Sequence, residues 1–300
     1  MIAGQSRGRW RALLGVALAA LGACRARPPR QSVDRVVVAE TDAALRLETI
    51  GVTRDEVMRA AVEAVRASPR FGPPAPEGDK ARRWLGRVAV HRAETLTGGG
   101  PPLAQVVLTL ELSPQEGAGA LRETSGAAEP VGPGPRGLRD AFGRAAAAAL
   151  GRAVAGFDLL LAAEGKGDAA LVADLRSPDA RVRDVAVRVL ADRRHAGAVP
   201  ALVERLSDPD PEVVERAIGA LGQIGDPRAV TPLVRLAQRR QGPSVAQLAR
   251  IIGDIGGPDA RAYLLTLASG SPDRLVQEAA QQALDEMTAR EAQARPAAKR

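Results

Sequence analysis

The stretch Val182 to Leu190, VRDVAVRVL, returns 31 residues later as Val213 to Leu221, VVERAIGAL. Apolar residues in both stretches follow the spacing of an amphipathic helix. The same interval of 31 separates the leucines of a preceding short segment, within the strings AALV, PALV, TPLV and AYLL: Leu171, Leu202, Leu233 and Leu264. A fixed period predicts a stack of similar units, because one unit cannot bury its apolar faces alone.

Two further columns share this register. One is Leu190, Leu221, Ile252 and, after a one-residue insertion, Leu284; the other is Ala186, Ala217, Leu248 and Ala280. Pro-Asp turns within units and Gly/Pro turns between them mark where helices begin and end. We therefore expect an all-α solenoid of about four helix pairs over residues 168–290, with residues 291–300 as a disordered basic tail. The third pair departs from the pattern, because Gln241-Gly242-Pro243 replaces the Asp-Pro turn.

This pattern resembles the short HEAT-like repeats, including the kind found in phycobilin lyases. The resemblance covers about 120 of the 300 residues. It implies a solenoid whose second helices line a concave surface. It does not transfer a reaction, because a shared fold does not carry a function.

The N-terminus has the three parts of a secretory signal. Arg7, Arg9 and Arg11 are followed by the apolar run ALLGVALAA and then by Leu21-Gly22-Ala23-Cys24. The run from residue 12 to residue 24 is 13 residues long, whereas a membrane-spanning helix needs about 20. Residues 1–23 are therefore expected to be removed, and subtracting their three charges from the formal +7 leaves +4.

The tetrapeptide that ends this signal resembles the lipobox of bacterial lipoproteins. The resemblance implies that the thiol of Cys24 receives a diacylglyceryl group and that the chain is cut before it. Cys24 is the only cysteine, which excludes an intramolecular disulfide. Residues 24–32 are polar and proline-bearing, as a tether would be. No Asp follows the cysteine, so we expect attachment to the outer membrane of the cell envelope, facing the periplasm. An ordinary signal cut elsewhere, or a free structural thiol, is the alternative.

Residues 33–163 predict a small α+β domain. Short strands are expected at Val36–Val38 and 45–50, and longer ones at 84–93 and 103–112, with a weak strand at 120–124. Thr53 and Glu56 form a capping-box pattern at the start of a helix. Residues 126–137 are interpreted as a flexible Gly/Pro linker. It leads into a long helix over residues 138–163. Because Arg152 and Asp158 would place charges within a bilayer, we expect a buried helix rather than a membrane span.

The sequence offers no catalytic constellation. His91 and His195 have no Cys or His neighbour at ligand spacing, and no Gly-Lys-Ser/Thr phosphate loop occurs. Asp208, Asp210 and Glu212 cluster at a turn, where Asp normally caps a helix, with calcium binding as the alternative. We therefore predict a protein that is not an enzyme and that needs no cofactor and no metal.

A nucleic-acid partner is not expected either. The stretch from Arg181 to Arg194 is basic, but Asp179, Asp184 and Asp192 interleave with its arginines, and aromatic residues make up only 2% of the chain. A formal charge of +4 on the exported chain is modest.

What remains is protein binding. The outward positions of the second helices are polar, and all but Gln247 are charged, with both signs present: Arg181, Asp184, Arg188, Glu212, Glu215, Arg216, Gln247 and Arg250. Mixed charges favour a protein partner of complementary charge. The sequence thus predicts a membrane-anchored lipoprotein that acts as a non-catalytic scaffold or adaptor for envelope proteins. A HEAT-like enzyme subunit, or a lyase-type binder of a small ligand, is the alternative.

Overall fold

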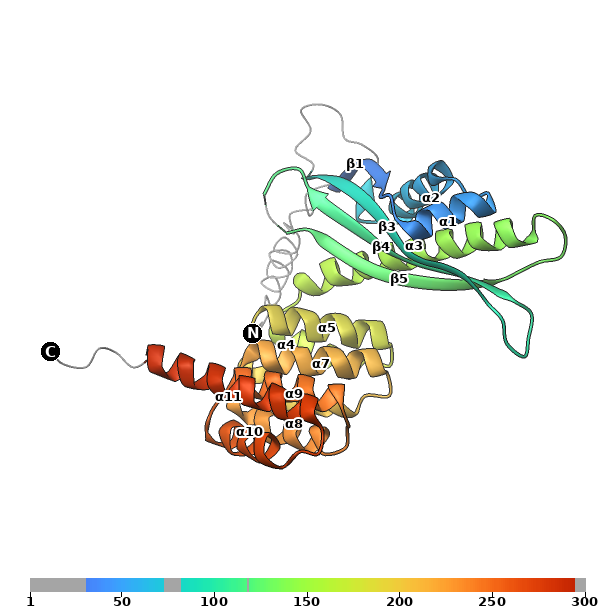
Figure 1. The fold of residues 1–300 in the computed structure, drawn as a ribbon. Coiled ribbons are helices and arrows are strands. Elements are labelled where there is room, and N and C mark those ends of the chain that lie inside the picture. Colours follow the sequence, from blue (N-terminus) through green and yellow to red (C-terminus); the bar gives the residue numbers. More distant parts are fainter. Residues whose placement is uncertain (1–30, 73–81, 118, 295–300) are drawn as a thin grey trace, which may run out of the picture.

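The computed structural model describes residues 31–72, 82–117 and 119–294. Figure 1 shows an N-terminal part in which helices pack on one face of a sheet, and a C-terminal part built from paired helices. The long helix α3 (Gly137–Glu164) joins the two parts. The expected combination of an α+β domain and an all-α solenoid is confirmed.

The sheet has five strands in the order β2-β1-β3-β4-β5. Their bounds are Gln31–Val38 (β1), Phe71–Gly72 (β2), Arg82–Leu96 (β3), Leu103–Pro114 (β4) and Leu121–Pro130 (β5). Strand β1 runs parallel to β2 and β3, whereas β3, β4 and β5 are antiparallel to one another. Along β4 every second side chain is buried, from Ala104 to Leu112. This alternation directs one face of the sheet toward the helices.

Helices α1 (Asp42–Ile50), α2 (Arg54–Ala67) and α3 cover that face. At the start of α2 the Thr53 side chain accepts a hydrogen bond from the Glu56 backbone N–H, and the Glu56 carboxylate accepts one from the Thr53 N–H. The predicted capping box is therefore confirmed. It satisfies two N–H groups that the first helical turn leaves without partners.

The strand expected over residues 45–50 is wrong, because this segment lies within α1. The Thr41 side chain accepts a hydrogen bond from the Ala44 N–H and caps the helix. Gly51 ends α1 in the left-handed conformation at φ 96°, which a side chain would disfavour. Buried Ala44 and Leu47 are three residues apart, so the apolar period is helical.

The flexible linker expected over residues 126–137 is also wrong in its first part. Strand β5 runs to Pro130, and its residue Gly126 pairs with Val107 of β4. Pro130, at the last pair of the ladder, lies opposite Leu103. A proline is tolerated here because β5 is an edge strand, where one side of the backbone makes no ladder bonds.

Helix α3 is the one helix in the described ranges that is long and apolar enough to cross a membrane. Its side chains Phe142, Leu150 and Phe157 are fully buried, and the helix packs on β4, β5, α2 and α5. The core helix of a folded domain meets the same criteria of length and composition. The burial of α3 agrees with its interpretation as a packed helix.

The C-terminal part consists of four helix pairs. The first helices are α4 (Asp168–Asp174), α6 (Val199–Glu204), α8 (Val230–Ala237) and α10 (Pro258–Gly270). The second helices are α5 (Ala180–Asp192), α7 (Pro211–Ile224), α9 (Pro243–Ile255) and α11 (Arg274–Ala294). All four leucines of the first column are fully buried, as the repeat predicts. Helix α11 continues to Ala294, so the tail predicted from residue 291 is helical in its first four residues.

Candidate functional site

The eight predicted binding residues lie on the successive second helices α5, α7 and α9, which pack side by side (Figure 1). We call the surface that they form the second-helix face. Asp184 and Arg188 are partly buried, and the other six are exposed. Capping positions this face, because Asp179 and Asp210 each accept a hydrogen bond, 2.9 Å long, from the backbone N–H two residues on. These caps fix where α5 and α7 begin.

Ion pairs connect neighbouring helices across the second-helix face. Arg216 of α7 donates to the Asp184 carboxylate of α5. Glu215 accepts a hydrogen bond of 2.6 Å from Arg240, which lies in the turn before α9. Ion pairs at a protein surface stabilise it by about 1 kcal/mol or less, and in these two pairs only Asp184 and Arg240 are partly buried. They hold the side chains in place while leaving their remaining hydrogen-bonding groups accessible.

Arg188 connects the second-helix face to the sheet domain. Its guanidinium lies 3.4 Å from the carboxylate of Glu123 on β5, and each side chain is 22% exposed. The same guanidinium also lies 3.9 Å from Asp184. Arg188 is thus already engaged within the chain, a contact that repeat spacing could not reveal because its partner lies 65 residues away.

A cleft lies where the two parts of the chain meet, between β5 and α3 on one side and α5 and α7 on the other. It encloses about 270 Å³. Its charged lining comes from both parts: Glu123, Arg152, Arg181, Asp184, Asp210, Glu212 and Arg216. Four of the predicted binding residues therefore line this cleft.

Burial raises the pKa of Glu123 from its ordinary value, and the nearby charge of Asp184 raises it further. The charge and hydrogen bonds of Arg188 lower the pKa, but they only partly offset the burial. A carboxylate that is desolvated in this way favours its protonated form more than an exposed one does. The contact between the sheet domain and the solenoid therefore depends on a group whose charge is incompletely compensated.

The spacing of the repeats did not predict an ion pair that lies inside the solenoid. Arg183 of α5 donates two hydrogen bonds, of 2.8 Å and 2.6 Å, to the carboxylate of Asp208 in the next repeat. Both residues are buried. One signal was present, because Arg183 precedes Ala186 and Leu190 at helical spacing and so lies on the apolar stripe.

The acidic cluster at this turn has two separate structural roles. Asp208 binds Arg183 and Arg205, whereas Asp210 caps α7. The capping role predicted for this turn is thus confirmed for Asp210. Over the described parts of the chain, no group of three or more His, Cys, Asp or Glu side chains is arranged to hold a metal ion.

The two histidines lie far apart in the fold. His91 of β3 makes a hydrogen bond of 2.7 Å with Thr109 of β4, on the sheet face that the helices leave open. His195, in the turn after α5, lies 3.3 Å from the carboxylate of Asp168. Cys24, with the signal peptide and most of the tether, lies outside the described residues.

Comparisons with known proteins support the architecture of the C-terminal part. Residues 169–251 match the family of HEAT repeats. None of the curated proteins compared with the chain matches it.

Several solved structures are similar to part of the chain. The complex of CpcE and CpcF of phycocyanin lyase from Nostoc sp. PCC7120 is 23% identical at a TM-score of 0.36, covering 46% of this chain and 61% of that one. An engineered protein is 27% identical at a TM-score of 0.33, covering 47% and 74%. A designed armadillo repeat protein is 22% identical at a TM-score of 0.33, covering 46% and 76%. The chain thus spans less than two thirds of the lyase chain that it matches. The sheet domain is therefore followed by a helical region, and the family match identifies that region as HEAT repeats.

Proposed function

We propose that this chain is a lipoprotein of the bacterial cell envelope that holds partner proteins on the second-helix face of its HEAT repeats. The lipid on Cys24 tethers it to a membrane, with the outer membrane facing the periplasm as the expected location. The chain acts as a scaffold and performs no reaction of its own.

One observation carries this proposal: six exposed polar residues, five of them charged and of both signs, lie on three helices packed side by side, next to a cleft of about 270 Å³. A continuous surface of this kind suits a protein, because a folded partner contacts many positions at once. Repeat solenoids provide extended surfaces for such contacts. Charge complementarity across the surface would set the association rate and the selectivity.

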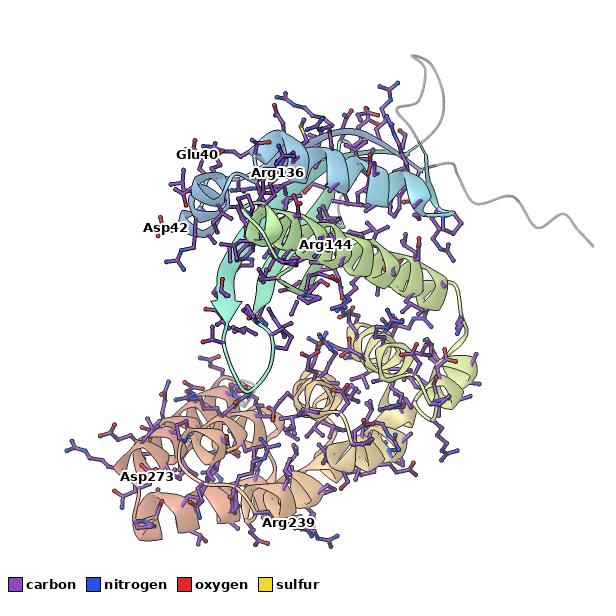
Figure 2. The ribbon with its side chains drawn as sticks, turned by 90° about the vertical axis from the view of Figure 1, so that its right-hand side faces the viewer. Glu40, Asp42, Arg136, Arg144, Arg239 and Asp273 are labelled. Atoms are coloured by element: carbon purple, nitrogen blue, oxygen red, sulfur yellow. The ribbon has the colours of Figure 1, made fainter. Side chains whose placement is uncertain are left out.

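The binding face can be tested by site-specific photo-crosslinking in the envelope of the native host. A crosslinking amino acid at Gln247 is expected to capture a partner as a discrete adduct. The same amino acid at Arg239 serves as the control; this position lies in the turn after α8, the first helix of the third pair (Figure 2). We expect no adduct from position 239, because it does not belong to the second-helix face.

Charge reversal provides the second arm of this test. The double variant Arg181→Glu and Arg250→Glu should abolish the adduct formed from position 247. The matched control is Arg235→Glu with Arg239→Glu, which makes the same change of charge at exposed residues outside the face. Equal adducts in both double variants, with unchanged thermal unfolding, would show that the second-helix face is not the binding surface.

The anchor is tested separately. Metabolic labelling with an alkyne fatty acid should label the wild-type chain, and Cys24→Ser should abolish the label and release the chain from the membrane fraction. An unlabelled wild-type chain in the soluble fraction would contradict the lipid anchor and leave the binding test unaffected.

A further inference from the structure

The two edges of the sheet differ in how their backbone groups are satisfied. At the β5 edge, two arginines of α3 reach across and donate hydrogen bonds to backbone carbonyls. Arg152 donates to the Gly126 oxygen at 2.5 Å, and Arg144 donates to the Pro130 oxygen at 3.0 Å. Side chains that occupy an edge in this way prevent further strands from pairing with it.

No described side chain protects the β1 edge in this way over most of its length. Among the described residues, β2 pairs with β1 only at Gln31 and Ser32. Just past the end of β1, the Ala39 N–H donates to the Val88 oxygen of β3 at 2.8 Å. Because backbone groups alternate along a strand, the N–H and C=O groups of Val36 and Val38 point toward the opposite, outer edge.

A groove of about 400 Å³ runs along this outer edge. Its lining includes every residue from 33 to 38 of β1, together with Met58, Val62 and Val65 of α2. Successive side chains of a strand point to opposite faces, so a cavity that touches six consecutive residues must follow the backbone edge. Six residues of strand extend about 20 Å. The groove therefore has the length of a short strand, with an apolar floor on the α2 side.

The uncommitted charges around the groove are mainly basic. Arg35 and Arg66 are exposed and line it. Arg54 also lines the groove but binds Glu40 and Glu48, and Asp34 is paired with Arg83. Asp55 is the remaining acidic residue in the lining. An occupant with an acidic side chain would therefore be favoured near Arg35 and Arg66.

We propose that an extended segment of a partner protein binds in this groove as an additional strand on β1. Its backbone pairs with the N–H and C=O groups of Val36 and Val38. Its apolar side chains, at alternate positions, pack on Met58 and Val62, and an acidic side chain on the opposite face of the added strand lies near Arg35. Backbone pairing supplies the affinity in this mode of recognition, and the side-chain pockets supply selectivity.

A partner segment fits this edge better than a second copy of the chain. Pairing two β1 strands across a two-fold axis would bring the basic lining of one groove toward that of the other, including Arg35 and Arg66 of each copy. Like charges brought together oppose such an interface. This binding site is separate from the second-helix face, and the proposal stands independently of the function proposed for that face.

The proposal is tested with the full chain and a defined probe, the fluorescein-labelled hexapeptide Glu-Val-Thr-Val-Thr-Val. Fluorescence anisotropy should show saturable binding, which weakens when Lys replaces the Glu of the peptide. N-methylation of one alternate set of peptide amides should weaken binding at least about tenfold, whereas N-methylation of the other set leaves it within about twofold. This asymmetry is specific to strand pairing, since only one set of amides faces β1. Equal effects of the two sets would overturn the proposal.

Protein variants and hydrogen exchange locate the peptide. Met58→Glu should abolish binding, and Leu265→Glu, the same kind of change at an exposed leucine of α10, should not. The bound peptide should slow exchange of the Val36 and Val38 amides. Two results would overturn the proposal. In the first, the Val36 and Val38 amides are already protected in a monomer that does not bind the peptide, which would mean that the chain covers its own edge. In the second, these amides are protected only in a dimer that forms as the protein concentration rises. The peptide comparison uses the unaltered chain, so it holds even if Met58→Glu fails to fold.

Discussion

Arg183 of the first repeat holds Asp208 of the second through two hydrogen bonds between buried side chains. Arg183 also donates to the backbone oxygens of Ser177 and Pro178, in the turn of its own repeat. One guanidinium therefore connects the turns of two successive units. Because a solenoid is stabilised largely by contacts between neighbours, such a connection fixes how the first two repeats stack.

Asp208→Asn should destabilise the chain strongly. Burial by itself would raise the pKa of Asp208, but the hydrogen bonds and charges of Arg183, with the Asp210 N–H and Arg205, outweigh burial and lower it. Removing the charge leaves Arg183 buried without its counter-ion, which costs about 3–5 kcal/mol in unfolding free energy. Urea unfolding measures this loss.

The control for that substitution is the double variant Arg183→Met with Asp208→Asn, which removes the buried Arg183 charge together with its partner and leaves Arg205 with Glu204, 3.8 Å away. It should be more stable than Asp208→Asn alone, because the two changes act on one interaction. Simple additivity of the two single effects would contradict the interaction.

In the wild-type chain, a lowered pKa means that the stabilisation from Asp208 is complete above the ordinary aspartate pKa. This stabilisation is lost as the pH falls through the lowered pKa.

Glu123 should make the opposite contribution to the pH dependence of stability. Its raised pKa means that the folded state holds the proton of the Glu123 carboxyl more tightly than the unfolded state does. The contribution of Glu123 to the unfolding free energy is therefore greatest below the ordinary pKa of 4.5 and declines as the pH rises through the raised pKa. The unfolding free energy of the wild-type chain minus that of Glu123→Gln should therefore fall between acidic and neutral pH. A flat difference would show that burial does not perturb this carboxylate.

Two glycines on second helices should respond to alanine in opposite directions. A Cβ atom at Gly253 of α9 would lie 2.7 Å from the Cβ of Ala283 on α11, so Gly253→Ala should destabilise the last two repeats by about 1–3 kcal/mol. A Cβ at Gly219 of α7 would meet nothing within 4 Å. Gly219→Ala should stabilise the helix by about 0.5–1 kcal/mol. Thermal unfolding of both variants checks the pair, and equal shifts would contradict the close approach of α9 and α11.

The double variant Arg144→Ala with Arg152→Ala should open the β5 edge. Removing these donors exposes backbone carbonyls that could then pair with strands of other molecules. We expect concentration-dependent oligomers in sedimentation velocity, whereas Arg136→Ala, just before α3, should stay like the wild type. A monomeric double variant would show that other groups protect this edge.

Sequence alone determined the solenoid, because each repeat carries the same apolar positions at an interval of 31 and those positions must be buried between neighbours. It also determined the start of α2, since the capping box of Thr53 and Glu56 involves residues only three apart. It did not determine α1 or the full length of β5. Short apolar segments fit a helix and a strand nearly equally well, and pairing with β4 is what extends β5 to Pro130.

Only the tertiary structure decided which charges are buried and which edges are open. Repeat spacing placed Arg188 on an outward surface, but its contact with Glu123 depends on how the sheet domain packs against α5. Likewise, no local pattern shows that two arginines of α3 occupy the β5 edge while no described side chain occupies most of the β1 edge, because that difference comes from how the helices pack on the sheet. Local patterns fix elements, whereas contacts between residues distant in sequence fix the surfaces available for binding.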